Sequence, residues 1–154
     1  MAVQTRRTAA LLGMIAWLAS TGTCAGDSPD QVTIRQLLTS TFAKAASRLQ
    51  VEPVVVVGDH AIAGWIQGER GGRALLGRHH GTWRIAACSG DGLKDPKVLI
   101  DADVPAAEAG ALARGVVEAE APFTVQQRAK FSSFDGWMRV DRGETHPPAS
   151  VPPH

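Results

Sequence analysis

The sequence predicts an α+β domain: an N-terminal helix, a four-stranded antiparallel meander, and C-terminal helices packed on one face of the sheet. Three observations predict this class. After Ser28, apolar residues recur at the three- and four-residue spacing of a helix. Residues 54–88 are short apolar segments separated by glycine-rich turns. After residue 105 the helical spacing of apolar residues returns. Short strands joined by tight turns pair with their neighbours, and helices then cover the resulting sheet.

The first helix is predicted over residues 30–48. Ser28 can cap it, Pro29 suits the first helical position, and Gln31 completes a capping box. Apolar residues then recur at three- and four-residue steps: Ile34, Leu37, Leu38, Phe42, Ala45 and Leu49. This spacing places them in one stripe along one face of the helix.

Four strands are predicted next, at residues 54–57, 60–67, 73–78 and 82–88. The turns between them are Gly58-Asp59, residues 68–72, and His79-His80-Gly81. In the fourth strand, alternation places Trp83, Ile85 and Ala87 on one face of the sheet. Cys88 is then expected on the opposite face.

Two helices are predicted after the meander. The first covers residues 106–121, enters through Asp103-Val104-Pro105 and ends at Pro122. A capping box at Thr124 opens a second, short helix that runs through Phe131. Residues 137–140 are a candidate edge strand.

The N-terminus resembles a secretion signal. Arg6 and Arg7 precede an apolar run over residues 8–19, and small residues follow up to Ala25. The run is about a dozen residues, shorter than the roughly 20 that a membrane span needs. We weighed lipid attachment at Cys24 and twin-arginine export, and the neighbouring residues favour neither. We therefore predict a signal peptide over residues 1–25 and a periplasmic mature protein that does not span the membrane.

The mature chain is predicted to hold one domain over residues 26–142 and a disordered, proline-rich tail over residues 143–154. Loss of the signal lowers the Lys and Arg count from 16 to 14 against 15 Asp and Glu, so the formal charge changes from +1 to −1. This balance argues against nucleic acid as a partner, because nucleic-acid binding requires a basic face. Cys88 remains as the single cysteine, which excludes an internal disulfide.

Three histidines are the first candidate metal ligands. The predicted turns bring His60, His79 and His80 to one end of the sheet, and imidazole suits copper, zinc or nickel. The simpler interpretation is that these are solvated turn residues. Cys88 is expected at the opposite end, about 20 Å away, which disfavours a shared metal or a catalytic Cys88–His60 pair.

Cys88 and Met138 are the second candidate pair. Thiolate and thioether are the soft ligands that select Cu(I), and the sequence does not place Met138 relative to the sheet. The alternative is that Cys88 is a small buried apolar residue. The aspartates lie at turns, where their side chains usually bond the local backbone, and nothing pairs them as acid and base. We predict that the protein is not an enzyme.

Motifs across most of residues 50–136 resemble the bacterial copper uptake system-associated proteins. They are Val51-Glu52-Pro53-Val54-Val55, Gly58-Asp59-His60-Ala61-Ile62-Ala63-Gly64-Trp65, Gln67-Gly68, Gly71-Gly72-Arg73-Ala74-Leu75-Leu76, Cys88-Ser89-Gly90-Asp91, Leu93-Lys94-Asp95 and Phe131-Ser132-Ser133-Phe134-Asp135-Gly136. The resemblance implies an exported accessory of copper uptake. It also implies a partner in the envelope, either an outer-membrane receptor or an inner-membrane transporter.

The resemblance leaves the role of the domain open between two hypotheses. The first is a carrier that holds copper. The second is a metal-free periplasmic module whose open sheet face binds a partner or a small apolar ligand. Members of the family often end in a histidine-rich tail, whereas this chain has only His146 and His154 there.

Overall fold

The structure is a computed structural model that describes residues 26–43 and 47–140. The helices are α1 (Pro29–Phe42), the 3-10 helix η1 (Asp91–Lys94), α2 (Pro96–Asp101), α3 (Ala106–Glu120) and α4 (Val125–Ser132). The strands are β1 (Leu49–Val57), β2 (His60–Gln67), β3 (Arg70–His79), β4 (Thr82–Ser89) and β5 (Trp137–Arg139). The predicted signal peptide at 1–25 and tail at 143–154 lie outside the described residues, as do residues 44–46 and 141–142 of the predicted domain.

The strands form one antiparallel sheet in the order β1-β2-β3-β4-β5. The α+β class and the meander are therefore confirmed, with a fifth strand added at the edge of β4. Two-residue turns join the first four strands. Gly58, Gly68 and Gly81 adopt positive φ angles there, which glycine reaches without steric cost.

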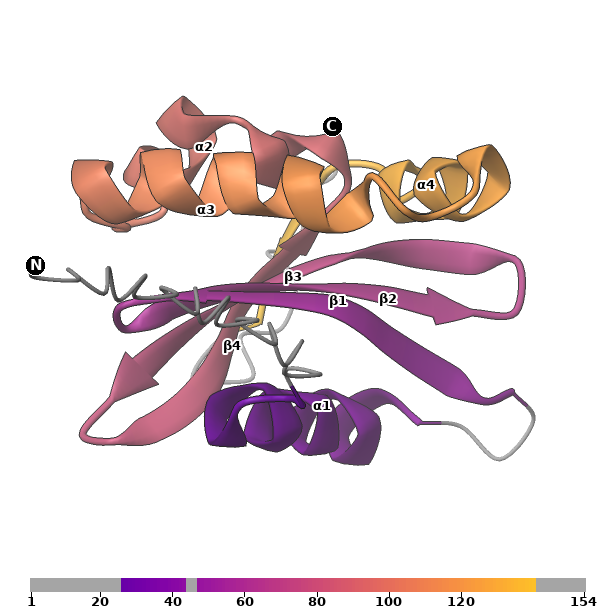
Figure 1. The fold of residues 1–154 in the computed structure, drawn as a ribbon, viewed down its shortest axis with the longest axis horizontal. Coiled ribbons are helices and arrows are strands. Elements are labelled where there is room, and N and C mark those ends of the chain that lie inside the picture. The colour runs from indigo at the N-terminus through magenta and orange to yellow at the C-terminus, as the bar shows by residue number, and fades with distance from the viewer. Residues whose placement is uncertain (1–25, 44–46, 141–154) are drawn as a thin grey trace, which may run out of the picture.

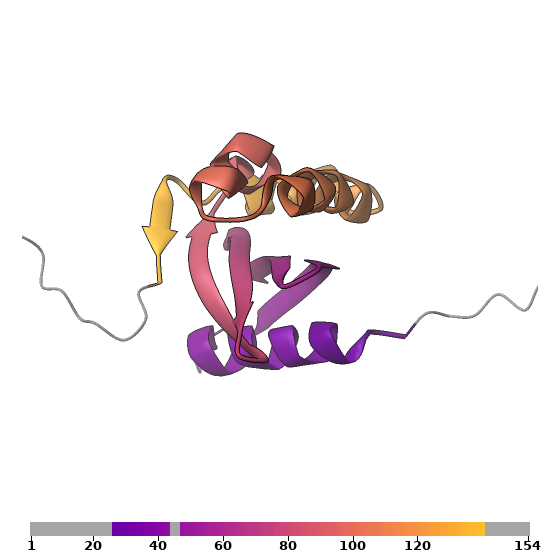
Figure 2. The ribbon, with the colours of Figure 1, turned by 90° about the vertical axis from the view of Figure 1, so that its left-hand side faces the viewer.

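Helices lie on both faces of the sheet (Figures 1 and 2): α1 on one, and α2, α3 and α4 on the other. The C-terminal helices thus share one face, as predicted, whereas the position of α1 on the opposite face was not predicted. The strands are apolar on both sides, since Ala63 and Leu76 face the α1 cluster while Ile62 and Leu75 face the α3 cluster. A sheet with two apolar faces needs cover on both to remove them from water.

The first helix is shorter than predicted and the first strand is longer. Helix α1 ends at Phe42, and Ala43 already has an extended backbone with ψ 129°. Leu49, which the helical period included, begins β1 opposite Gln67 and is buried. Pairing and burial in the sheet thus override the helical spacing at this position. The capping box of Ser28 and Gln31 forms as predicted.

A β-bulge in β4 corrects the predicted alternation. Leu76 pairs with Ile85 while Leu75 pairs with Ala87, so Ala86 is an extra residue in β4. The faces exchange beyond this point. Cys88 therefore joins Ile85 in the α1 cluster, and the prediction that it faces the other way is wrong.

A buried ion pair joins β3 to the helices on the α3 side. The Arg73 side chain is fully buried, and its guanidinium donates to both carboxylate oxygens of Glu120, at 2.6 and 2.7 Å. It also donates to the backbone oxygen of Phe131 at 3.1 Å. These contacts tie α3 and α4 to the same strand.

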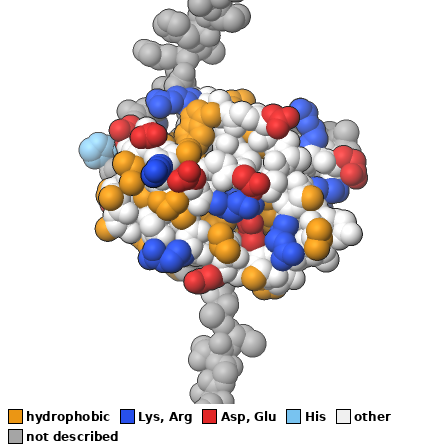
Figure 3. All heavy atoms as spheres, turned by 90° about the horizontal axis from the view of Figure 1, so that it is seen from above, with side chains coloured by type: hydrophobic (Ala, Val, Ile, Leu, Met, Phe, Trp, Pro, Cys, Tyr) orange, Lys and Arg blue, Asp and Glu red, His pale blue; other side chains and the backbone are white. Residues whose placement is uncertain are grey.

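The face formed by α2, α3 and α4 carries basic and acidic side chains interspersed with apolar ones (Figure 3). Within residues 26–43 and 47–140, no helix has both the length and the apolar character needed to cross a membrane.

Candidate functional site

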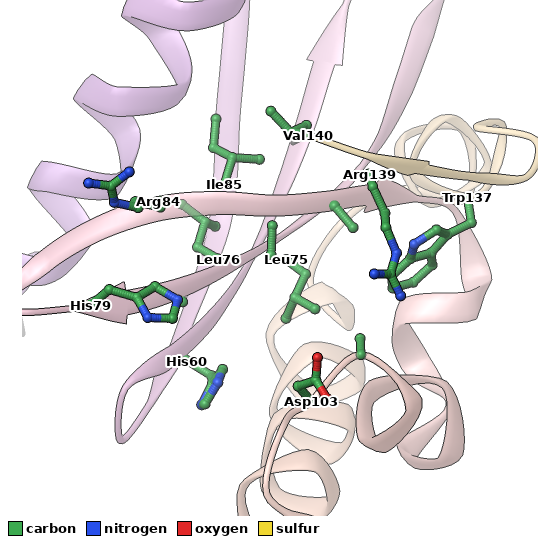
Figure 4. A pocket seen from close by; sticks show the side chains of 14 residues that line it. His60, Leu75, Leu76, His79, Arg84, Ile85, Asp103, Trp137, Arg139 and Val140 are labelled. Carbon is green, nitrogen blue, oxygen red and sulfur yellow. The ribbon is translucent and has the colours of Figure 1, made fainter. Parts of the chain in front are cut away.

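A cleft of about 430 Å³ lies between strands β3 to β5 and the segment that joins α2 to α3 (Figure 4). Helix α3 packs against β1 and β2 and leaves the next strands of the same face less covered. Small residues at Gly77, Ala86 and Ala87 keep the cleft hollow. His60 and His79 lie toward one end, and Trp137 and Arg139 lie at the other.

His60 is held by a carboxylate of α3. It is the first residue of β2, and its Nδ1 lies 2.6 Å from Oε2 of Glu108. A carboxylate oxygen accepts hydrogen bonds, so Nδ1–H of His60 is the donor in this contact. Nε2 is then the ring nitrogen that remains available to another partner. A Cβ on Gly58 would stand 2.6 Å from Oε1 of Glu108, so a side chain there would displace this carboxylate, and the φ of +58° also favours glycine.

The structure brings His79 close to His60. His60 pairs with Gly77 across the strands, and His79 follows two residues later on the same face. The position that a Gly77 Cβ would occupy is 3.4 Å from Nε2 of His79 and 3.9 Å from Cδ2 of His60. The absence of a side chain at Gly77 therefore leaves the space between the two rings open.

His80 does not join this pair. It occupies the β3–β4 turn with a φ of +50°, is exposed, and is not among the residues that line the cleft. Among the residues that the structure describes, no group of three or more His, Cys, Asp or Glu side chains is arranged to hold a metal ion. Of the three predicted histidines, two converge.

Cys88 and Met138 are brought together by β5. They pair directly across β4 and β5, so their side chains start on the same face of the sheet. Cys88 is 2 % exposed, whereas Met138 is 45 % exposed. Burial raises the pKa of the Cys88 thiol to about 11. Metals bind the thiolate, so a metal bound here would have to displace the thiol proton.

The sulfur pair lies well away from the histidine pair. Cys88 pairs with Ala74, whereas His79 pairs with Thr82 at the other end of β4. Six residues of strand correspond to about 20 Å. The structure thus places the predicted ligands in two separate groups, as the sequence led us to expect.

The sequence did not indicate the remaining side chains of the cleft. Arg84, Asp103, Trp137 and Arg139 line it, and Glu108 supports His60 from behind. Trp137 and Arg139 reach the cleft only because β5 pairs with β4. The sequence indicated β5 only as a candidate edge strand and did not indicate its partner. Glu108 is 48 residues from His60, and no local pattern links the two.

No protein-family model matches the chain, and neither a curated protein nor a solved structure matches it.

Proposed function

We propose that the protein is an exported, periplasmic accessory of copper uptake, and that it carries copper at the mouth of the cleft on His60 and His79. The observation that supports the site is the contact of His60 Nδ1 with Glu108 at 2.6 Å, beside a second imidazole. Histidines that bind metals usually donate their other ring N–H to a carboxylate, which fixes the tautomer and the ring orientation.

Two protein ligands suit a carrier better than a storage site. Imidazole is a good ligand for copper, and two such groups leave other coordination positions to water or to a ligand from a partner. An ion held in this way remains accessible to a receiving protein. The partner in this proposal is the copper uptake machinery of the envelope, an outer-membrane receptor or an inner-membrane transporter, and the proposal gives the domain no catalytic step.

The test is a Cu(II) titration of the mature protein, followed by electron paramagnetic resonance and by competition with a chromophoric chelator. We expect one site with nitrogen ligands that is lost in His60→Ala and in His79→Ala. His80→Asn is the matched control, because asparagine tolerates the positive φ of this turn. Cys88→Ala tests the sulfur pair under Cu(I).

The results separate the two candidate copper sites. Retention of Cu(II) binding in both His60→Ala and His79→Ala would overturn the histidine site. Loss of Cu(I) binding in Cys88→Ala alone would instead move the site to Cys88 and Met138. Export has its own test: the periplasmic form should begin at Gly26 by mass spectrometry.

A metal-free ligand-binding module is the second candidate function. The cleft of about 430 Å³ is far larger than one ion needs, and the described residues offer no three-ligand metal group. Because helices cover both faces of the sheet, the binding surface in this case is the cleft rather than an open sheet face. Binding of an organic ligand to metal-free protein would favour this candidate.

A further inference from the structure

We propose that the cleft binds a small organic anion, a carboxylate on a flat apolar body, at its Trp137 and Arg139 end. This inference goes beyond the copper proposal and does not rest on it. It uses other side chains of the cleft and requires no metal.

The charge of the lining favours an anion. Arg84 and Arg139 both line the cleft, and within the described part of the chain neither has a carboxylate oxygen within 4.0 Å. Among the described residues that line the cleft, Asp103 is the one acidic residue. Arg84 lies toward the histidine end of the cleft, so Arg139 is the guanidinium at the Trp137 end (Figure 4). A guanidinium presents parallel N–H donors that match the two oxygens of a carboxylate.

The shape of the same end favours a flat apolar body. Trp137 and Arg139 are two residues apart on β5, so their side chains leave the same face of the strand. Arg139 stands opposite Ala87, whose small side chain leaves room beside it, and Leu75 adds an apolar surface in the middle of the cleft (Figure 4). Trp137 remains 36 % exposed and offers an indole surface to a ring.

The volume favours an organic anion over an inorganic one. Small-molecule sites commonly measure about 300 to 1,000 Å³, and this cleft of about 430 Å³ lies within that range. A phosphate or sulfate ion would leave the indole and Leu75 without contacts. A ring that carries a carboxylate fills both parts of the site.

The test uses metal-free protein with benzoate as the probe. Binding is followed by the shift of the Trp137 indole N–H resonance in NMR spectra and by calorimetry. We expect saturable benzoate binding, at least about 10-fold weaker binding of the neutral isostere benzamide, and weaker binding of inorganic phosphate. Equal binding of benzoate and benzamide would overturn the role of charge, and equal binding of phosphate would overturn the role of the ring.

Variants then assign the carboxylate partner. Arg139→Gln should weaken benzoate binding about 10- to 100-fold, because it removes a charge-assisted hydrogen bond. Arg70→Gln is the control, since Arg70 is an exposed arginine that does not line the cleft. The same loss in both variants, or no saturable binding to the wild type, would contradict the proposal. Because no copper is present, failure of the copper proposal leaves these results unaffected.

Discussion

Arg73 shows how a single buried charge fixes this fold. Its guanidinium is held by Glu120 and by the backbone of Phe131, and no buried side-chain nitrogen or oxygen in the described residues lacks a hydrogen-bond partner. The ring of Phe131 lies 5.8 Å from the guanidinium carbon. A buried charge is tolerated only with such a complete set of partners, so each partner is worth more than its own contact.

Glu120→Gln should therefore destabilise the domain strongly. The change removes the buried carboxylate from Arg73 and leaves it with the more exposed carboxylate of Asp91, 3.3 Å away. The expected loss in the free energy of unfolding is about 3 kcal/mol. Urea unfolding followed by circular dichroism measures it. Glu118→Gln is the matched control on the exposed side of α3, with an expected change within about 0.5 kcal/mol. Equal losses in the two variants would show that the buried pair has no special role.

Burial of Cys88 predicts a loss of stability at alkaline pH. The thiol ionises near its ordinary pKa of 9.0 in the unfolded chain but near 11 in the native protein. Between these values the unfolded state has released the proton and the native state has not. The free energy of unfolding should thus fall by up to about 1.4 kcal/mol per pH unit above pH 9.

Cys88→Ala should remove this part of the pH dependence. The measurement is a series of urea unfolding curves from pH 7 to pH 11 for both proteins. Identical slopes in wild type and variant would mean that the thiol is not shielded in the native state. Thiol-specific reagents provide a second check, since a buried protonated thiol should react only on unfolding.

The sequence predicted three histidines at one end of the sheet, but neither which two converge nor what surrounds them. Tight turns beside His60 and His79 made their approach predictable, because each turn fixes the ends of its two strands. Glu108, Arg84 and Arg139 were not recognised, since they meet the histidines or the cleft only through tertiary contacts. Candidate ligands beside tight turns can thus be predicted from the sequence, whereas the residues that contact them from distant elements cannot.

At the scale of elements, the predicted helices and strands exist, but the short helices η1 and α2 were not predicted, and other errors lie at a boundary of α1 and within β4. The apolar period carried α1 past Phe42 to Leu49, although Leu49 belongs to β1. Alternation in β4 failed at Ala86, because a bulge adds a residue with no mark in the sequence. A periodic pattern reports which residues are buried, but not which neighbour buries them.

Close backbone contact positions α4 on the sheet. A Cβ at Gly71 would lie 2.6 Å from the backbone oxygen of Lys130, so α4 approaches β3 only where no side chain intervenes. Gly71→Ala should displace α4 and lower the free energy of unfolding by about 1–3 kcal/mol. Thermal and urea unfolding measure the effect.

Gly110→Ala is the contrasting variant. This glycine lies within α3, where a Cβ meets nothing closer than Nη1 of Arg114 at 3.5 Å. Alanine favours the helix, so the expected change is a gain of about 0.5–1 kcal/mol. A loss at Gly110, or a gain at Gly71, would contradict this account of helix packing.

For the whole molecule, the composition and the spacing of apolar residues were enough to predict the α+β class and the antiparallel strand order. They did not predict which face of the sheet each helix covers. An amphipathic stripe on α1 shows that one side of the helix is buried, without showing against which face of the sheet. The sequence of β2 does indicate the layers, because its neighbouring residues Ile62 and Ala63 are both apolar and point to opposite faces of the sheet. Such a strand requires two covering layers.

The short last strand leaves part of the sheet edge open. Strand β5 pairs only with Ala87–Ser89, and the stretch of β4 from Thr82 to Ile85 has no strand partner on that side within the described residues. An open edge can recruit the same edge of another copy. Two copies aligned antiparallel about Arg84 would set two guanidinium groups opposite each other, which opposes pairing.

Arg84→Val should therefore promote growth of the sheet from one molecule into the next. Sedimentation velocity should show an average size that rises with protein concentration in the variant more steeply than in the wild type. Matching profiles would mean that something other than this charge protects the edge. Arg84 would then protect the molecule against aggregation at the part of the β4 edge that the short strand β5 leaves unpaired.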